Sequence, residues 1–76
     1  MRGIRLEWLA TEVLHGLPSD EARATVQDLL VEVAGHPDWW PEPGGEEIAE
    51  AFGPRCWVSF VAYLDEVEAR DVGWAG

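Results

Sequence analysis

The chain has 76 residues, of which 15 are acidic and five are arginine, and none is lysine, so its formal net charge is −10. A chain of this length forms a single domain, residues 1–76, and its 47% apolar content excludes a disordered acidic tail. Because Lys and Arg provide most of the affinity for phosphates, this chain alone is not expected to bind nucleic acid directly. An anionic membrane surface would repel it for the same reason.

The sequence contains no apolar run of the roughly 20 residues that a membrane span needs. It also shows no secretory signal pattern, so a cytoplasmic protein is expected. A disulfide within the chain is excluded, because Cys56 is the single cysteine. Its neighbours Trp57 and Val58 favour a small buried side chain over a nucleophile. His15 and His36 do not have the spacing of a zinc site, and we expect neither a metal nor a cofactor.

The first secondary-structure signal is an alternation of apolar and charged side chains over residues 3–8, which ends at Trp8. This period of two predicts a half-buried strand. Residues 11–15 are then expected to form a short helical turn that begins at a Thr11 cap and stops at Gly16.

Residues 18–37 give the clearest pattern. Ser19 is a good N-cap, and two acidic residues follow it in the first turn, where the helix dipole favours them. One apolar stripe continues at helical spacing, formed by Ala22, Val26, Leu29, Leu30 and Val33. Gly35 and then Pro37 stop the helix. The sequence therefore predicts an amphipathic helix here.

Residues 37–45 are rich in proline and glycine, which predicts a loop. The adjacent Trp39 and Trp40 in this loop have two interpretations. They are either an exposed aromatic anchor for a protein partner or a cover for a small core. Residues 46–52 stay ambiguous between a strand and a helical turn.

The stretch from Cys56 to Trp74 decides the fold class. Its β-branched and aromatic residues favour an antiparallel hairpin with a turn near Asp65 and Glu66. The rival is a single helix over residues 55–70, which would make the protein all-α. With the hairpin, the prediction is an α+β fold in which a small antiparallel sheet packs against one main amphipathic helix.

Five short stretches share the pattern of one protein family: residues 4–8 (IRLEW), 17–23 (LPSDEAR), 34–37 (AGHP), 53–60 (GPRCWVSF) and 71–74 (DVGW). The second is similar to that family's helix entry, the third to its helix exit, and the last two to its closing strands. On these stretches the chain resembles the RelE/ParE superfamily of toxin proteins.

The resemblance implies a small sheet packed against helices and a role as one half of a toxin–antitoxin pair. Members of the RelE type cut mRNA on the ribosome with basic residues on the sheet. The resemblance thus makes endoribonuclease activity a hypothesis and implies Arg55 and Arg70 as catalytic residues. Trp39, Trp40 and Trp74 are the partner-binding candidates.

The expected partner is a protein, either an antitoxin or a target. Its contacting segment should be neutral or basic, because a charge of −10 repels an acidic one. The number of copies in the assembly stays open. A second hypothesis, from a different class, is an acidic inhibitor or nucleic-acid mimic that blocks a basic site on another protein. Such a complex would weaken with salt. The ordinary alternative is that the charge serves solubility alone.

Overall fold

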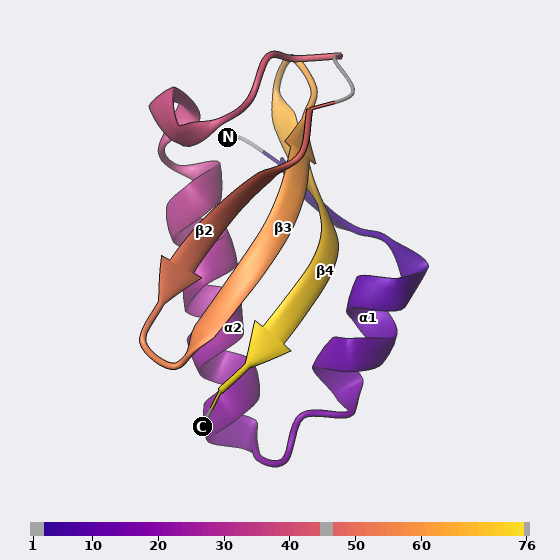
Figure 1. Cartoon of the computed structure of the whole chain (residues 1–76), viewed down its shortest axis with the longest axis vertical. Coiled ribbons are helices and arrows are strands. Elements are labelled where there is room, and N and C mark those ends of the chain that lie inside the picture. The colour runs from indigo at the N-terminus through magenta and orange to yellow at the C-terminus, as the bar shows by residue number, and fades with distance from the viewer. Residues whose placement is uncertain (1–2, 45–46, 76) are drawn as a thin grey trace.

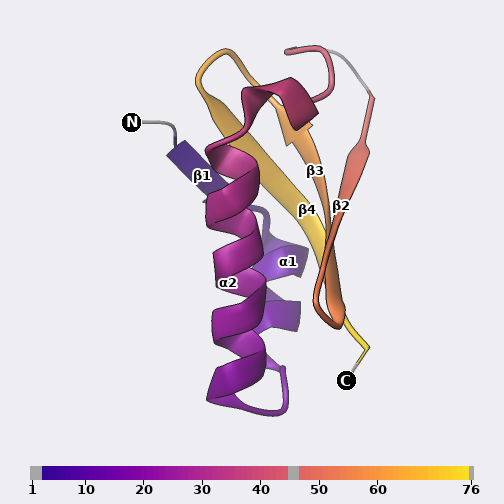
Figure 2. The ribbon, with the colours of Figure 1, turned by 90° about the vertical axis from the view of Figure 1, so that its left-hand side faces the viewer.

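The described residues, 3–44 and 47–75 of this computed structural model, form two helices and a four-stranded sheet. In chain order the elements are β1 (Gly3–Leu6), α1 (Trp8–His15), α2 (Asp20–Ala34), a 3₁₀ turn (Pro37–Trp39), β2 (Ala49–Gly53), β3 (Cys56–Ala62) and β4 (Glu66–Trp74). The sheet order is β1–β4–β3–β2, and both helices lie on one side of it (Figures 1 and 2). The predicted α+β class is confirmed, and the all-α alternative is excluded.

The predicted C-terminal hairpin is the centre of the sheet. β3 pairs antiparallel with β4, and the Tyr63 amide donates a 2.8 Å hydrogen bond to the Glu66 carbonyl where the hairpin closes. β2 pairs antiparallel with β3 on the other side. β1, however, pairs parallel with β4, so the sheet is mixed and not wholly antiparallel. The chain between β1 and β4 contains both helices, β2 and β3, so this parallel pair has the long connection that it requires.

The main amphipathic helix, α2, is as predicted. The Ser19 hydroxyl accepts a 3.1 Å hydrogen bond from the Ala22 amide, which satisfies one of the free N–H groups at the helix start. The helix ends at Gly35, whose amide bonds back to the last turn. Every residue of the predicted apolar stripe is buried, against the sheet. The fully buried Val26 and Val33 face the core, together with Phe60 and Val58 of β3.

The N-terminal prediction was wrong in its boundaries. The strand ends at Leu6, and Trp8 begins α1 with 73% of its surface exposed. The cap is Glu7 and not Thr11, which lies inside the helix. The physical reason is that Ala10 and Leu14, four residues apart, both reach the core only from a helix, and this burial outweighs a short alternation.

The ambiguous segment before the hairpin contains an edge strand, β2. Its alanines Ala49 and Ala51 pack against the core, whereas Glu50 and Phe52 are exposed on the opposite face. This alternation is short and its inward residues are small, which is why the sequence left the assignment open. Among the described residues, no helix has the length and apolarity that crossing a bilayer would require.

Candidate functional site

The face of the sheet that turns away from the helices is open, and it faces the viewer in Figure 1. Strand register decides which side chains share this face. One set of cross-strand neighbours consists of Phe52, Trp57 and Gly73, which we term the aromatic rung. The next set consists of Glu50, Ser59 and Asp71, which we term the acidic rung. The two rungs lie side by side across β2, β3 and β4.

The aromatic rung depends on a glycine. A Cβ placed on Gly73 would meet Cε2 of Trp57 at 2.0 Å, so the indole lies directly against the Gly73 backbone. Phe52 stands next to Trp57 on the edge strand and is 74% exposed. Two aromatic side chains therefore form an apolar surface on the open face, and one of them extends into solvent.

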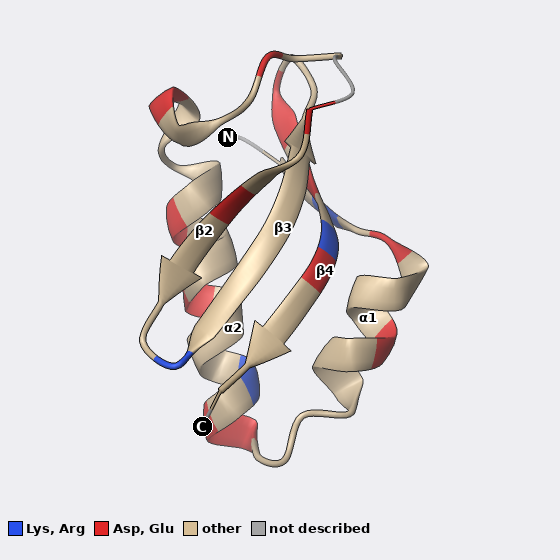
Figure 3. Cartoon of the chain, viewed as in Figure 1, with Lys and Arg blue, Asp and Glu red and all other residues tan. Residues whose placement is uncertain are grey.

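The acidic rung depends on a bulge in β4. Ser59 pairs with Asp71, but Phe60 pairs with Ala69, so Arg70 is an extra residue in the ladder. In such a bulge two successive residues oppose one residue on the neighbouring strand, which places Arg70 and Asp71 together on the open face. Oδ1 of Asp71 accepts a 2.9 Å hydrogen bond from the Val72 amide, which orients its carboxylate. Figure 3 shows an acidic segment of β2 and one of β4 on either side of β3.

The other half of the open face is a network of ion pairs. The Arg5 guanidinium lies 2.6 Å from Glu66 and 3.8 Å from Glu68, and it sits over the Tyr63 ring at 5.6 Å. Nε of Arg70 lies 3.0 Å from Glu68, whose side chain is only 13% exposed. That contact is close enough for an ion pair but is not aligned as a hydrogen bond.

A 3.6 Å contact with Glu7 adds a second carboxylate to Arg70. The charges of Arg5 and Arg70 are thus compensated by carboxylates within the network. Glu50 and Asp71 of the acidic rung then leave the described part of the open face with an excess of negative charge. This excess favours cationic ligands over phosphates.

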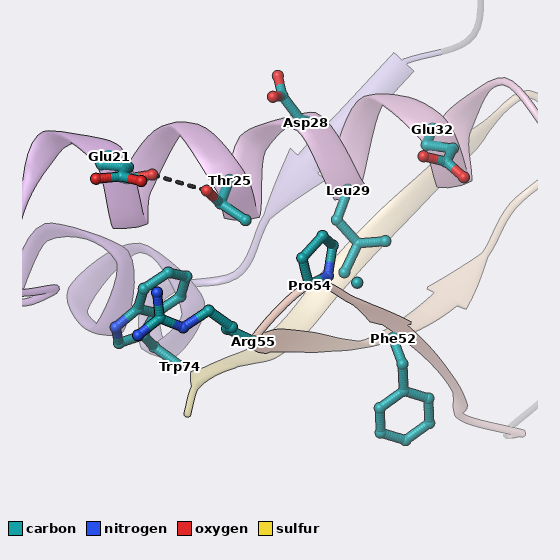
Figure 4. Close-up of a pocket in the computed structure, with 10 residues that line it drawn as sticks. Glu21, Thr25, Asp28, Leu29, Glu32, Phe52, Pro54, Arg55 and Trp74 are labelled. Carbon is teal, nitrogen blue, oxygen red and sulfur yellow. Dashed lines mark hydrogen bonds between the residues drawn. The ribbon is translucent and has the colours of Figure 1, made fainter. Parts of the chain in front are cut away.

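A separate groove of about 470 Å³ lies between α2 and the turn that joins β2 to β3. Pro54 and Arg55 form this turn, and Arg55 has a left-handed φ of 65°. Its guanidinium lies over the Trp74 ring at 5.5 Å from the centroid. Figure 4 shows this pair below α2, with the acidic lining residues on the helix: Glu21, Asp28 and Glu32. Phe52 points away from α2 in the same view.

The structure separates the two predicted catalytic arginines. Arg55 lies at the helix-side groove beside Trp74, and Arg70 lies on the open face with Glu68 and Glu7. Trp74 ends β4 about four residues beyond Arg70, and a strand rises about 3.3 Å per residue, so the two arginines are also far apart along the sheet. They do not come together as one anion site.

The predicted partner-binding tryptophans have three different environments. Trp40 folds back onto the core, and its indole Nε1 donates a 2.7 Å hydrogen bond to the Val33 carbonyl at the end of α2. Trp39 stacks on His36 with ring centroids 4.2 Å apart and remains 41% exposed. Trp74 is half-buried and packs partly against the core. Of these three, Trp39 offers the largest accessible ring.

Cys56 is buried, with 4% of its surface exposed, as the sequence predicted. Burial raises the pKa of its thiol, and a backbone hydrogen bond at Gly53 offsets part of this rise. A protonated, buried thiol is a poor nucleophile. Within residues 3–44 and 47–75, no three or more His, Cys, Asp or Glu side chains come together as metal ligands.

Sequence reasoning missed the two rungs. Glu50 and Phe52 lie in the segment whose secondary structure was ambiguous, and the bulge that turns Asp71 outward has no distinctive residue pattern. A usable signal was the Gly73 that follows Val72, because a glycine inside a strand often marks close approach by another group.

Searches of protein-family models, curated proteins and solved structures found no match to this chain.

Proposed function

We propose that this chain is a RelE/ParE-like, cytoplasmic domain that acts by binding a basic segment of a partner protein. The observation that supports this best is the charge arrangement on the open face. Arg5 and Arg70 are paired with carboxylates, while Glu50 and Asp71 add negative charge beside exposed aromatic rings. A cationic segment meets both attraction and an apolar contact surface here, whereas a nucleic-acid backbone meets repulsion.

The toxin–antitoxin part of the proposal is supported by the order of elements. A strand, two helices and three further strands follow one another, with the helices on one side of the sheet. This arrangement agrees with what the resemblance implies for a small sheet packed against helices. In this proposal the chain is one half of a protein pair, and its partner contributes the positive charge.

The charge arrangement supports a binding role over RNA cleavage. Cleavage requires preorganised positive charge at the phosphate as the transition state forms. Arg70 is the arginine on the open face nearest the bulge, and two carboxylates lie within 3.6 Å of its Nε atom. Arg55 is remote from it, on the groove side of the sheet. Arg70 and Arg5 share the Glu68 carboxylate, at 3.0 and 3.8 Å, so their positive charge is directed at a carboxylate of the chain itself.

The experiment is addition of the purified protein to a bacterial cell-free translation reaction, with protein synthesis and mRNA length followed over time. The proposal predicts continued synthesis and intact mRNA, even at protein concentrations well above those of the ribosomes. Arrest that is relieved by Arg70→Ala or Arg55→Ala would overturn it and establish the endoribonuclease hypothesis. The matched control is Arg23→Ala, on α2 and away from both surfaces.

A second candidate function is favoured by the groove along α2. Glu21, Asp28 and Glu32 lie seven and four residues apart, so they follow one side of the helix as a line of carboxylates. An acidic inhibitor that imitates a nucleic-acid backbone would present such a line to a basic enzyme site. If the chain has this function, it should inhibit a nucleic-acid enzyme, and Asp28→Asn and Glu32→Gln should abolish that inhibition. Substitutions on the open face should have little effect on it.

A further inference from the structure

We infer that the open face has a subsite for one arginine side chain of the partner, above Ser59, between the carboxylates of the acidic rung and against the indole of the aromatic rung. The inference rests on the proposed function, because it names the chemistry by which the partner is recognised. The occupant to which we commit is an extended protein segment that carries at least one arginine.

The spacing of the rungs suits a guanidinium. Neighbouring strands are about 4.8 Å apart, so the backbones at Glu50 and Asp71 are roughly 10 Å apart with Ser59 midway between them. Carboxylate side chains reaching inward from both sides span the width of one planar guanidinium, which has five donors in a fixed fork. The Ser59 hydroxyl lies below this position and can accept a further hydrogen bond.

The indole provides the face on which the guanidinium stacks. Trp57 is two residues from Ser59 on the same strand, so the two side chains lie about 6.6 Å apart on the same face. Because Trp57 lies against Gly73, its ring extends over β4, the strand on which Asp71 lies two residues away. A cation held by Asp71 is therefore within reach of the ring, and Trp is the best ring for such a contact.

The same chemistry already occurs twice within the fold. Arg5 sits over Tyr63 at 5.6 Å while it pairs with Glu66, and Arg55 sits over Trp74 at 5.5 Å. Each combines a guanidinium with an aromatic ring, and the first also includes a carboxylate. Trp57 with Asp71 and Glu50 repeats this arrangement of ring and carboxylates, and the partner would provide the guanidinium. The negative charge that attracts arginine repels the phosphates of a nucleic acid, which argues against base stacking on the same ring.

The test is a binding titration with a defined probe, a fluorescein-labelled eight-residue peptide of alternating arginine and serine with blocked ends, followed by fluorescence anisotropy. Glu50→Gln and Asp71→Asn each remove one charge from the acidic rung. Asn at position 71 preserves the Oδ1 acceptor for the Val72 amide. Glu12→Gln on α1 is the matched control, because it removes the same charge from an exposed helix surface that belongs to neither the open face nor the groove.

The expected result is about threefold weaker binding for each rung variant and roughly tenfold for the pair, the scale of exposed charge contacts. Glu12→Gln should change the dissociation constant by less than twofold. Phe52→Ser should weaken binding more than Leu64→Ser, which removes a 92% exposed apolar side chain from the hairpin turn. A peptide with lysine in place of arginine should bind more weakly, because an ammonium does not stack on the indole as a planar guanidinium does.

The inference would be overturned by equal weakening with Glu12→Gln and the rung variants, by equal affinity for the lysine peptide, or by no binding of the arginine peptide. Binding that is lost on Asp28→Asn and Glu32→Gln but not on the rung variants would relocate the contact to α2. That result would leave partner binding intact and refute only this subsite. Failure of the proposed function itself is seen separately, as translation arrest in the cell-free reaction.

Discussion

The indole of Trp57 lies directly on Gly73, where any side chain would overlap it: a Cβ at position 73 would be 2.0 Å from Cε2, far inside van der Waals contact. The two residues are direct cross-strand neighbours on β3 and β4. A glycine that is otherwise unfavourable inside a strand is thus required here, because it lets an aromatic ring lie against the sheet. The Trp57 ring can form part of the aromatic surface of the open face because residue 73 has no side chain.

Gly73→Ala should displace the Trp57 ring and destabilise the fold by about 1–3 kcal/mol, the usual range for overpacking. Urea unfolding measures the loss, and the arginine peptide should bind more weakly to the variant at temperatures where it remains folded. Gly35→Ala is the control, since a Cβ there would meet ordinary contacts at 3.5 Å. It should change stability by no more than about 1 kcal/mol. Equal effects of the two substitutions would contradict the contact.

Trp40→Phe should lower the free energy of unfolding by about 1 kcal/mol, because it leaves the Val33 carbonyl without its 2.7 Å hydrogen bond from the indole. Trp39→Phe should have a smaller effect, since a phenyl ring retains the stacking on His36 and this site is 41% exposed. Thermal unfolding of the two variants under the same conditions compares the two losses of stability. A larger loss at position 39 would mean that Trp40 is not the residue that covers the core.

Arg70 should prove to be a structural residue of the open face. Arg70→Met leaves the largely buried Glu68 carboxylate with Arg5 at 3.8 Å as its remaining ion pair. We expect a loss of about 1 kcal/mol, reduced from the value for a buried pair because the Arg70 side chain is 42% exposed. Adding Glu68→Gln should restore part of that loss in a double-mutant cycle. Additive effects of the two changes would show that the pair does not interact.

Burial of Cys56 should make the stability of the protein depend on pH in the alkaline range. Burial raises the pKa of its thiol above the ordinary value of 9.0, so the unfolded chain loses this proton first as pH rises. The stability that the protonated thiol contributes to the folded protein is fully present below pH 9.0, and it declines as pH rises through the folded-state pKa of Cys56. Cys56→Ala should therefore show a shallower loss of stability between neutral and alkaline pH. An identical slope in both proteins would refute the shift.

The same burial predicts slow chemistry at this thiol. Iodoacetamide at pH 8 should modify Cys56 slowly in the folded protein and rapidly in urea, because the reactive species is an exposed thiolate. Mass spectrometry follows the single modification. Comparable rates in both conditions would mean that this end of β3 opens readily.

The sequence predicted the long, locally determined elements. The Ser19 cap, the apolar stripe and Gly35 define α2 within a few residues, because each acts through contacts inside or directly beside the helix. The hairpin was also predictable, since most residues of β3 are β-branched or aromatic and β4 adds Val67, Val72 and Trp74. Local signals of this kind require no knowledge of the rest of the fold.

The parts that depend on distant neighbours were not predictable. Trp8 continued an apparent alternation, yet the burial of Ala10 and Leu14 placed it in α1. The position of Asp71 on the open face depends on a register shift near Ser59, which pairing between strands imposes. The candidate subsite is built from three strands, and its geometry exists only after they pair.

The open face should attract a cationic protein segment and repel nucleic acid. The most direct measurement titrates the unaltered protein with the arginine–serine peptide and with a fluorescein-labelled single-stranded RNA of 20 nucleotides, in one buffer at low and at physiological salt. We expect peptide binding that weakens with salt and no measurable RNA binding at either salt concentration. RNA binding that is tighter than peptide binding would contradict it.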